Sequence, residues 1–139
     1  MKKFDYSFEK ILKLKSYIRQ EKEIIFAEIA VKVQDLRNKV ETNRFVLANG
    51  IEEQGDPILY RKYCDRLAAE INYYENEIEK LMDEYNAKKK EYIKAKQEEE
   101  SFKKLKEKRY KKYLNEYYKE ENKVLDETGA NQYIRNSNG

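Results

Sequence analysis

The chain of 139 residues contains no histidine, no tryptophan, one cysteine, one proline and only four glycines. Without histidine, and with Cys64 as its lone thiol, it lacks the parts of Ser/His and Cys/His catalytic pairs and of zinc sites. A single cysteine cannot close an internal disulfide, and we expect Cys64 to fill space beside a helix seam. No glycine-rich phosphate loop is present either. The sequence therefore predicts a protein that is not an enzyme and carries no cofactor or metal.

Long hydrophobic runs are also missing. The amino terminus, MKKFDYSFEK, has no apolar stretch that could serve as a signal sequence or a membrane span. We therefore expect a cytoplasmic protein that does not insert into a bilayer.

Charged residues of both signs are abundant, at 41% of the chain, and 30 bases against 27 acids leave a net charge of only +3. Such a mixed surface does not favour polyanions. The stretch 102–127 is the most basic candidate, yet its nine Lys and Arg are accompanied by six Asp and Glu. Binding to nucleic acid is consequently the least favoured of the functions that we consider.

The scarcity of helix breakers predicts two long helices. The only cluster of breakers is ANGIEEQGDP, residues 48–57, in which Gly50 suits a helix stop and Asp56 before Pro57 suits a helix start. This predicts helix one at about 6–48, a loop at 49–56 and helix two at about 57–127. We expect residues 1–127 to form one domain and residues 128–139 to be a flexible tail. A second helix of about 100 Å requires a partner helix.

Both helices carry an apolar seam spaced mostly by three and four residues. The predicted seam of helix one is Phe4, Phe8, Ile11, Leu14, Ile18, Ile25, Ile29, Val33, Leu36, Val40 and Leu47, and that of helix two is Tyr60, Tyr63, Leu67, Ile71, Tyr74, Ile78, Leu81, Tyr85 and Tyr92. Folding the chain at the loop pairs residues whose numbers add to 106 or 107, so that Phe4 faces Phe102. The fold class is therefore all-α, an antiparallel coiled-coil hairpin with a longer, overhanging second helix. Near Lys22 and Lys88 we expect a partly polar layer.

The predicted overhang, beyond Phe102, carries apolar side chains with no helix left to cover them. Glu and Lys residues spaced by four explain its charges as support for the helix, whereas its aromatic residues favour docking of another protein. We expect Tyr73 and Tyr118, each beside a seam tyrosine, to face outward. The candidate docking residues of this open end are Lys104, Lys108, Arg109, Lys112, Tyr113 and Tyr117.

The opposite end of the hairpin is a second candidate surface. Tyr60 and Ile58 are expected to close the coiled coil, but Phe45, Val46 and Ile51 fall off the seam and should be exposed. These three residues are therefore candidates for binding a different partner.

The two ends of the sequence carry recognisable motifs. The opening KKFDYSFEKILKLKSY is an aromatic lead into an amphipathic helix, and the closing FKKLKEKRYKKYLNEYYKEENKVLDETG is a basic helix with spaced tyrosines. Both resemble the corresponding ends of the flagellar export protein family FliJ. The resemblance implies a hairpin similar to the central stalk of rotary ATPases. It also implies binding to the hexameric export ATPase FliI, promotion of its assembly, and contacts with the membrane export gate FlhA and export chaperones. The open end, 4–19 with 102–127, would enter the ATPase ring.

Two readings other than nucleic-acid binding stay open at this point. A general coiled-coil scaffold would have the same composition. The stalk protein of virulence secretion systems has a similar shape, so only the termini favour a flagellar protein. In the favoured reading, partners hold the protein at the cytoplasmic side of the inner membrane.

Overall fold

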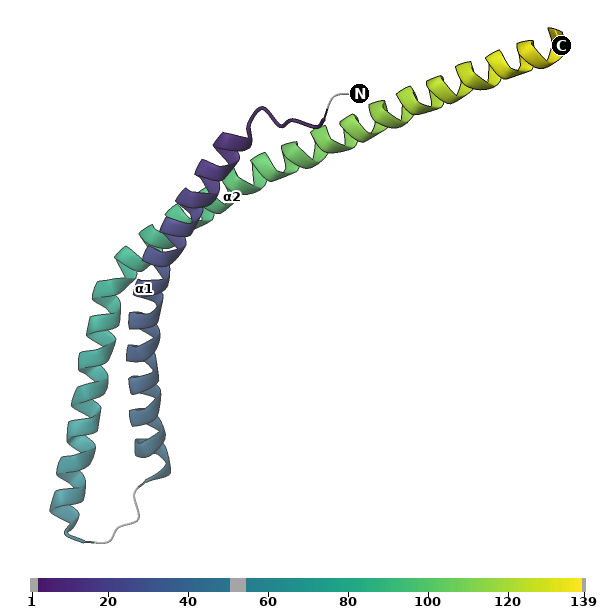
Figure 1. Ribbon diagram of the computed structural model, residues 1–139. Coiled ribbons are helices and arrows are strands. Elements are labelled where there is room, and N and C mark those ends of the chain that lie inside the picture. The colour runs from purple at the N-terminus through teal and green to yellow at the C-terminus, as the bar shows by residue number, and fades with distance from the viewer. Residues whose placement is uncertain (1–2, 51–54, 139) are drawn as a thin grey trace. The chain divides into compact units, whose positions relative to one another are not determined.

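The computed structural model describes residues 3–50 and 55–138, which form two helices, α1 (Glu9–Asn49) and the longer α2 (Pro57–Asn138) (Figure 1). The predicted all-α fold of two packed helices is confirmed. The contacts divide the chain into two compact units. We call Ile18–Ala95 the loop unit, and Met1–Tyr17 with Lys96–Gly139 the terminal unit.

The helix stop and start at the breaker cluster are as predicted. Gly50 ends α1 with a φ of 69°, and its N–H donates to the Val46 carbonyl at 3.0 Å. This is a left-handed cap that a residue with a side chain rarely adopts. The side-chain amide of Asn49 also donates to the Phe45 carbonyl, at 3.0 Å. At the start of α2, Pro57 is the first helical residue and the Asp56 carboxylate accepts from the N–H of Ile58 at 2.9 Å.

The outer ends of both helices differ from the prediction. Helix α1 begins at Glu9 rather than Tyr6, and the Glu9 N–H donates to the Tyr6 carbonyl at 3.0 Å. Helix α2 continues to Asn138, so the expected end at Glu127 is wrong. Gly129 costs a helix interior only about 1 kcal/mol relative to alanine, which is too little to stop a helix by itself.

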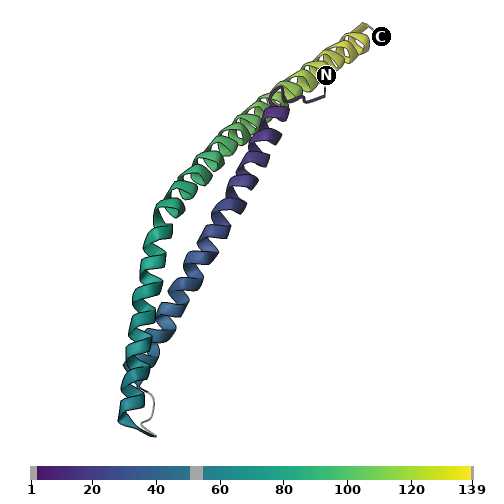
Figure 2. The ribbon, with the colours of Figure 1, turned by 90° about the vertical axis from the view of Figure 1, so that its left-hand side faces the viewer.

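The core of the loop unit follows the predicted seams. Here the helices run antiparallel and side by side (Figures 1 and 2). The buried apolar side chains of this unit are Ile29, Val33, Val40, Leu67 and Ala95 among the described residues, and Val33 is only 1% exposed. Ile25 departs from the prediction. It is 38% exposed, and Phe26 instead packs against Tyr85 and Tyr92, with ring centroids 5.2 and 5.9 Å away.

The pairing register differs from the prediction by about one heptad. Residue numbers add to 113 for the pair of Asn43 with Glu70, and to 113 again for Lys22 with Glu91. A shift by seven residues brings the same seams together, so periodicity cannot distinguish the two registers. A shift of seven residues displaces the two helices along their axes by about 10 Å. A connection of seven residues, 50–56, is long enough for this, since an extended chain spans about 3.3 Å per residue.

The shifted register has a consequence at the loop end. Helix α2 begins beyond the end of α1 in both views (Figures 1 and 2). Ile58 and Leu59, in the first turn of α2, are therefore 65% and 64% exposed. The prediction that Ile58 closes the coiled coil is wrong.

The partly polar layer of the loop unit is present. The Glu91 carboxylate lies 3.4 Å from the Lys22 ammonium and 3.5 Å from that of Lys88. The charge of Lys22, followed by that of Lys88, lowers the pKa of Glu91 from its ordinary value of 4.5. This layer therefore contains a carboxylate shared between two cations.

Candidate functional site

The residues before α1 pack along α2 as a short non-helical segment. We call residues 3–8 the strap (Figures 1 and 2). Its centre is Tyr6, which is only 4% exposed and whose hydroxyl donates to the Phe102 carbonyl at 3.0 Å. Phe8 packs edge to face on the Phe102 ring, with centroids 6.2 Å apart. Sequence periodicity missed Tyr6, because helical spacing does not apply to a segment that is not a helix.

Arg109 clamps the strap onto α2. Its guanidinium lies over the Phe8 ring at 4.7 Å and near the Tyr6 ring at 5.7 Å. It also donates to the Ser7 hydroxyl at 2.8 Å. The geometry thus engages Arg109 within the chain, whereas the sequence placed it on a surface for a partner.

The strap also covers part of the predicted overhang. Phe4 packs on Tyr110 and Tyr113, with centroids 5.1 and 5.4 Å away, rather than facing Phe102. The expectation that Tyr110 and Tyr113 have no intramolecular partner is therefore wrong. In the same unit Leu12 is buried, while the predicted seam residue Leu14 is 56% exposed.

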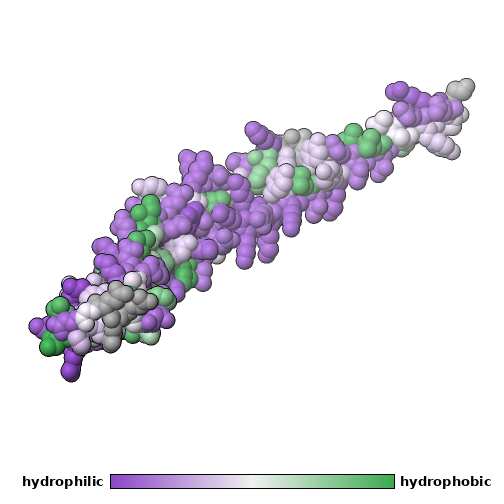
Figure 3. Space-filling model, turned by 90° about the horizontal axis from the view of Figure 1, so that it is seen from below, coloured by the Kyte–Doolittle hydropathy of each residue, from purple (hydrophilic) through white to green (hydrophobic). Residues whose placement is uncertain are grey.

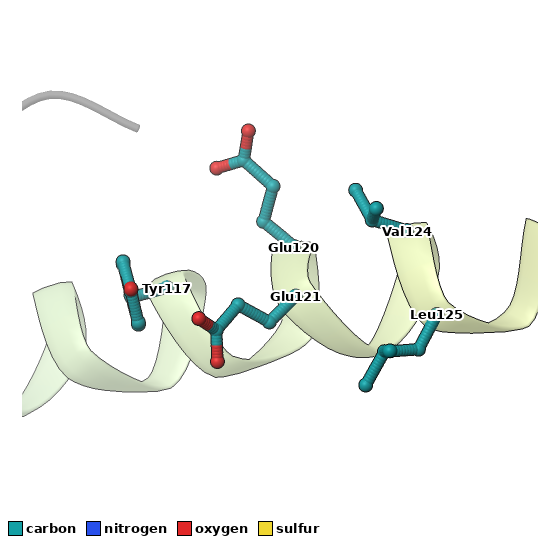
Figure 4. A pocket seen from close by; sticks show the side chains of 5 residues that line it. All are labelled: Tyr117, Glu120, Glu121, Val124 and Leu125. Atoms are coloured by element: carbon teal, nitrogen blue, oxygen red, sulfur yellow. The ribbon is translucent and has the colours of Figure 1, made fainter. Parts of the chain in front are cut away.

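The aromatic row on α2 continues past the strap. Tyr113 contacts Tyr117 with centroids 6.4 Å apart, and Tyr117 contacts Tyr118 at 5.9 Å. Beyond them Val124 and Leu125 are 56% and 67% exposed. We call Tyr117, Tyr118, Val124 and Leu125 the terminal stripe. Figure 4 shows three of these residues lining a shallow depression with Glu120 and Glu121.

The terminal stripe lies in an acidic segment rather than a basic one. Residues 116–127 contain five acids and two lysines, whereas residues 102–113 contain seven bases and one acid. A hydrogen bond to the Glu121 carboxylate, together with its charge, raises the pKa of Tyr117. The uncovered apolar surface and the basic surface are thus separate along α2.

The remaining basic candidates share one face of α2. Lys104, Lys108 and Lys112 are exposed, are spaced by four residues, and make no ion pair within residues 3–50 and 55–138. We call them the lysine row. The six predicted residues of the open end therefore separate into the lysine row, the Arg109 clamp, and an aromatic pair, Tyr113 and Tyr117, that extends from the strap to the terminal stripe.

Of the three residues predicted to be exposed at the loop end, the structure shows one exposed. Phe45 is 68% exposed, Val46 is half-buried, and Ile51 lies outside the described residues. The exposed Ile58 and Leu59 belong to the same end and were missed, because their exposure depends on the register. On the face drawn in Figure 3, hydrophobic residues form separate green patches in a mostly hydrophilic surface.

Two further properties concern the described part of the chain. It contains no group of three or more Cys, Asp or Glu side chains that could hold a metal ion. Neither described helix has a stretch that is both long and apolar enough to cross a membrane.

Comparison with known proteins gives one match. The family model described as Flagellar FliJ protein matches residues 4–138. No curated protein and no solved structure matches the chain.

Proposed function

Because the chain belongs to the flagellar FliJ protein family and is thus a structural component of the flagellar export apparatus, we propose that it is the stalk that couples the export ATPase to the membrane gate. In this role it binds the hexameric ATPase FliI, promotes assembly of the ring, and contacts the gate FlhA and export chaperones. It carries out no catalysis of its own. It works in the cytoplasm, held at the inner membrane by these partners.

The terminal stripe is the observation that supports ATPase binding. The strap covers the first rings of the aromatic row on α2, and the row then continues into exposed apolar side chains. These exposed side chains are available for contact with a partner. Fully burying an aliphatic or aromatic side chain contributes about 1.5–3 kcal/mol, so four such residues can offset much of the cost of association. Tyr117 is the central anchor of this contact, and Tyr113, which already packs on Phe4, supports it from the strap side.

The lysine row has a different part in the proposal. Its ammonium groups are exposed and have no carboxylate partner among the described residues, so an acidic surface of the ring can attract them. Exposed charges at the rim of an interface mainly raise the association rate, whereas buried aromatic anchors slow dissociation. Lys104, Lys108 and Lys112 therefore steer the encounter, and the tyrosines hold the complex together.

Binding to the purified export ATPase tests this proposal. The variant Tyr117→Ala with Val124→Ser should bind about tenfold more weakly or worse, mainly through faster dissociation. It should also promote less ATPase assembly, measured by sedimentation velocity. Asn115→Ala with Asn122→Ala is the matched control, since both residues are exposed on the opposite face of the same segment. Equal affinity of the stripe variant, the control and the parent chain would remove the terminal stripe from the mechanism.

The loop end is the proposed contact with the export gate. Phe45, Val46 and Ile51 were its sequence candidates, and the structure adds the exposed Ile58. Phe45→Ala with Ile58→Ser should reduce binding to the purified cytoplasmic part of the gate and impair export, while ATPase binding stays unchanged. Loss of ATPase binding in parallel with export would contradict two separate contact surfaces.

A further inference from the structure

Helix α1 has a second heptad stripe on the face that does not contact α2. Six successive positions, spaced by four and three residues, are uncharged in a chain of which 41% is charged. We call them the outer stripe: Gln20, Ile24, Ala27, Val31, Gln34 and Asn38. All six are exposed, with Ile24 and Val31 at 60% and 59%.

The outer stripe is distinct from the packed seam. Val31 and Val33 differ by two residues, or about 200° around the helix, so they point to nearly opposite sides. Val33 is buried against α2 at 1% exposure, while Val31 is 59% exposed. A repeat of apolar residues spaced by three and four is the pattern by which one helix packs along another. In the outer stripe this repeat is formed by Ile24, Ala27 and Val31, and further along the stripe the Gln34 side-chain amide donates to the Asn38 side-chain oxygen at 2.9 Å. Within the loop unit α2 covers only the opposite side, so the second repeat matches a helix that the described residues of this unit do not supply.

A depression beside the outer stripe offers a place for an inserted side chain. It has a volume of about 470 Å³ and is lined by Glu23, Phe26, Ala27, Ala30, Val31, Gln34 and Tyr92. The small Ala27 and Ala30 leave the space open. One wall is formed by the Phe26 ring, which stacks on Tyr92 at an interplanar angle of 10° and a centroid distance of 5.9 Å. Apolar depressions between helix side chains accommodate the anchor residues of helical partners.

The charges that flank the outer stripe indicate the chemistry of the partner. Four flanking acids make no ion pair in the described ranges: Glu21, Glu28, Asp35 and Glu41. Glu23, on the same side of the stripe as Glu41, pairs with Arg19 at 2.7 Å. Of the nearby bases, Lys39 lies over the Tyr74 ring of the packed seam at 5.5 Å, the Arg37 guanidinium donates to the Met82 sulfur at 3.9 Å, and Lys32 is exposed. The four unpaired acids outnumber these three bases, two of which contact side chains of α2, so the rim of the outer stripe has an excess of negative charge.

We propose that the outer stripe binds an amphipathic helix of a partner protein whose apolar residues are flanked by Lys or Arg. A second copy of α1 docked on the same stripe would place acids against acids, which disfavours self-association. The proposal concerns residues of the loop unit alone, so it does not rest on ATPase binding through the terminal unit.

A designed helical peptide is the probe for this surface. It carries Leu at the two core positions of three heptads and Lys at the flanking positions, and a second peptide differs only in having Glu at the flanks. The full-length chain should bind the Lys peptide at least about tenfold more tightly than the Glu peptide in fluorescence anisotropy. Hydrogen exchange should show new protection at residues 20–38. Equal affinity for the two peptides, or protection elsewhere, would overturn the proposal.

Two variants test the residues. Ile24→Ser with Val31→Ser should weaken binding of the Lys peptide about tenfold without changing helix content, because both side chains are already more than half exposed. Ile58→Ser with Leu59→Ser is the control, since it removes equally exposed apolar side chains from another face. An equal loss in the control would show nonspecific binding. A concentration-dependent dimer in sedimentation equilibrium that the stripe variant abolishes would show self-association and would also refute the proposal.

A charge exchange sharpens the test. Glu21→Lys with Glu28→Lys should reverse the preference, so that the Glu peptide becomes the tighter ligand. Binding to the export ATPase should stay the same in this variant and in Ile24→Ser with Val31→Ser. If ATPase binding were absent from the parent chain while the peptide preference held, the proposed function would fail and the outer stripe would stand.

Discussion

The loop unit and the terminal unit hold their helices together with different chemistry. The loop unit buries aliphatic side chains that repeat along both helices, such as Val33, Val40 and Leu67. The terminal unit instead uses directional contacts around Tyr6, whose hydroxyl reaches a carbonyl of α2, and Arg109, which lies over two rings. Repeated aliphatic contacts spread stability along a helix pair, whereas a few directional contacts concentrate it in single residues.

This difference has a consequence for function. The strap is fixed to α2 by a small set of contacts, next to the terminal stripe that we propose as a docking surface. Segments with few buried apolar contacts open at low free-energy cost, while a continuous core opens only with global unfolding. We therefore expect single substitutions to have global effects in the loop unit and local effects in the terminal unit.

The largest expected effect is that of proline in the loop unit. Leu67→Pro removes a backbone hydrogen bond in the interior of α2 and a side chain that is only 5% exposed. The backbone change alone should cost about 3 kcal/mol or more. Urea unfolding followed by circular dichroism measures it. Leu59→Pro is the control, because Leu59 lies in the first turn of α2 and is 64% exposed. Similar losses in both variants would contradict a core centred on Leu67.

The next effect is expected at the clamp. Arg109→Ala removes two cation–π contacts and the hydrogen bond to Ser7. The strap should lose about 1–2 kcal/mol of local stability. Faster hydrogen exchange at the Glu9 and Leu12 amides, with an unchanged unfolding midpoint, would show that the loss is local. Lys108→Ala is the neighbouring control, since Lys108 is exposed and has no ion pair in the described chain. Equal exchange rates in the two variants would show that Arg109 does not hold the strap on α2.

A smaller effect is expected from one atom of Tyr6. Tyr6→Phe keeps the buried ring and removes the hydroxyl that donates to the Phe102 carbonyl at 3.0 Å. A hydrogen bond of this type contributes about 0.5–1.5 kcal/mol. Amide exchange at Glu9 measures the change, and Tyr17→Phe, at an exposed tyrosine of the same unit, provides the control. A strap that is as stable in Tyr6→Phe as in Tyr17→Phe would show that the ring alone holds it.

The same contrast explains how much the sequence could predict. In the loop unit the helix breakers and the aliphatic seam identified Gly50, Asp56, Val33 and Leu67 correctly, because each depends on local backbone chemistry or on helical periodicity. The register could not be predicted, since a heptad shift preserves the pattern and the seven-residue connection permits it. The exposure of Ile58 depends on that register and was missed for the same reason.

In the terminal unit the prediction failed where the chain leaves the helix. The strap residues Phe4, Tyr6 and Phe8 alternate at every second position, a spacing typical of an extended segment, and this was the available signal for Tyr6. The sequence does not specify that Arg109 stacks on these rings. An arginine that faces solvent and one that packs on a neighbouring segment occur at the same positions of a helical repeat. The sequence itself shows that basic residues are concentrated in 103–112 and acidic residues in 116–127. It does not show which of these segments the strap covers, and this determines where apolar side chains stay exposed.

The smallest expected effect lies in the polar layer of the loop unit. Lys22 and Lys88 lower the pKa of Glu91 in the folded chain, so folding favours its charged form. The stabilisation is present above the unfolded pKa of Glu91 and is lost as pH falls through the lower folded pKa. Glu91→Gln should therefore be less stable than the parent chain at pH 7. The difference should shrink below about pH 4.5, the ordinary value, and also in 1 M salt, which screens partly exposed charges. Thermal unfolding at several pH values measures it against Glu84→Gln, an exposed carboxylate without an ion pair among the described residues. A difference that persists unchanged at pH 3 would assign the role of Glu91 to packing, and the loop unit would then depend on apolar contacts alone.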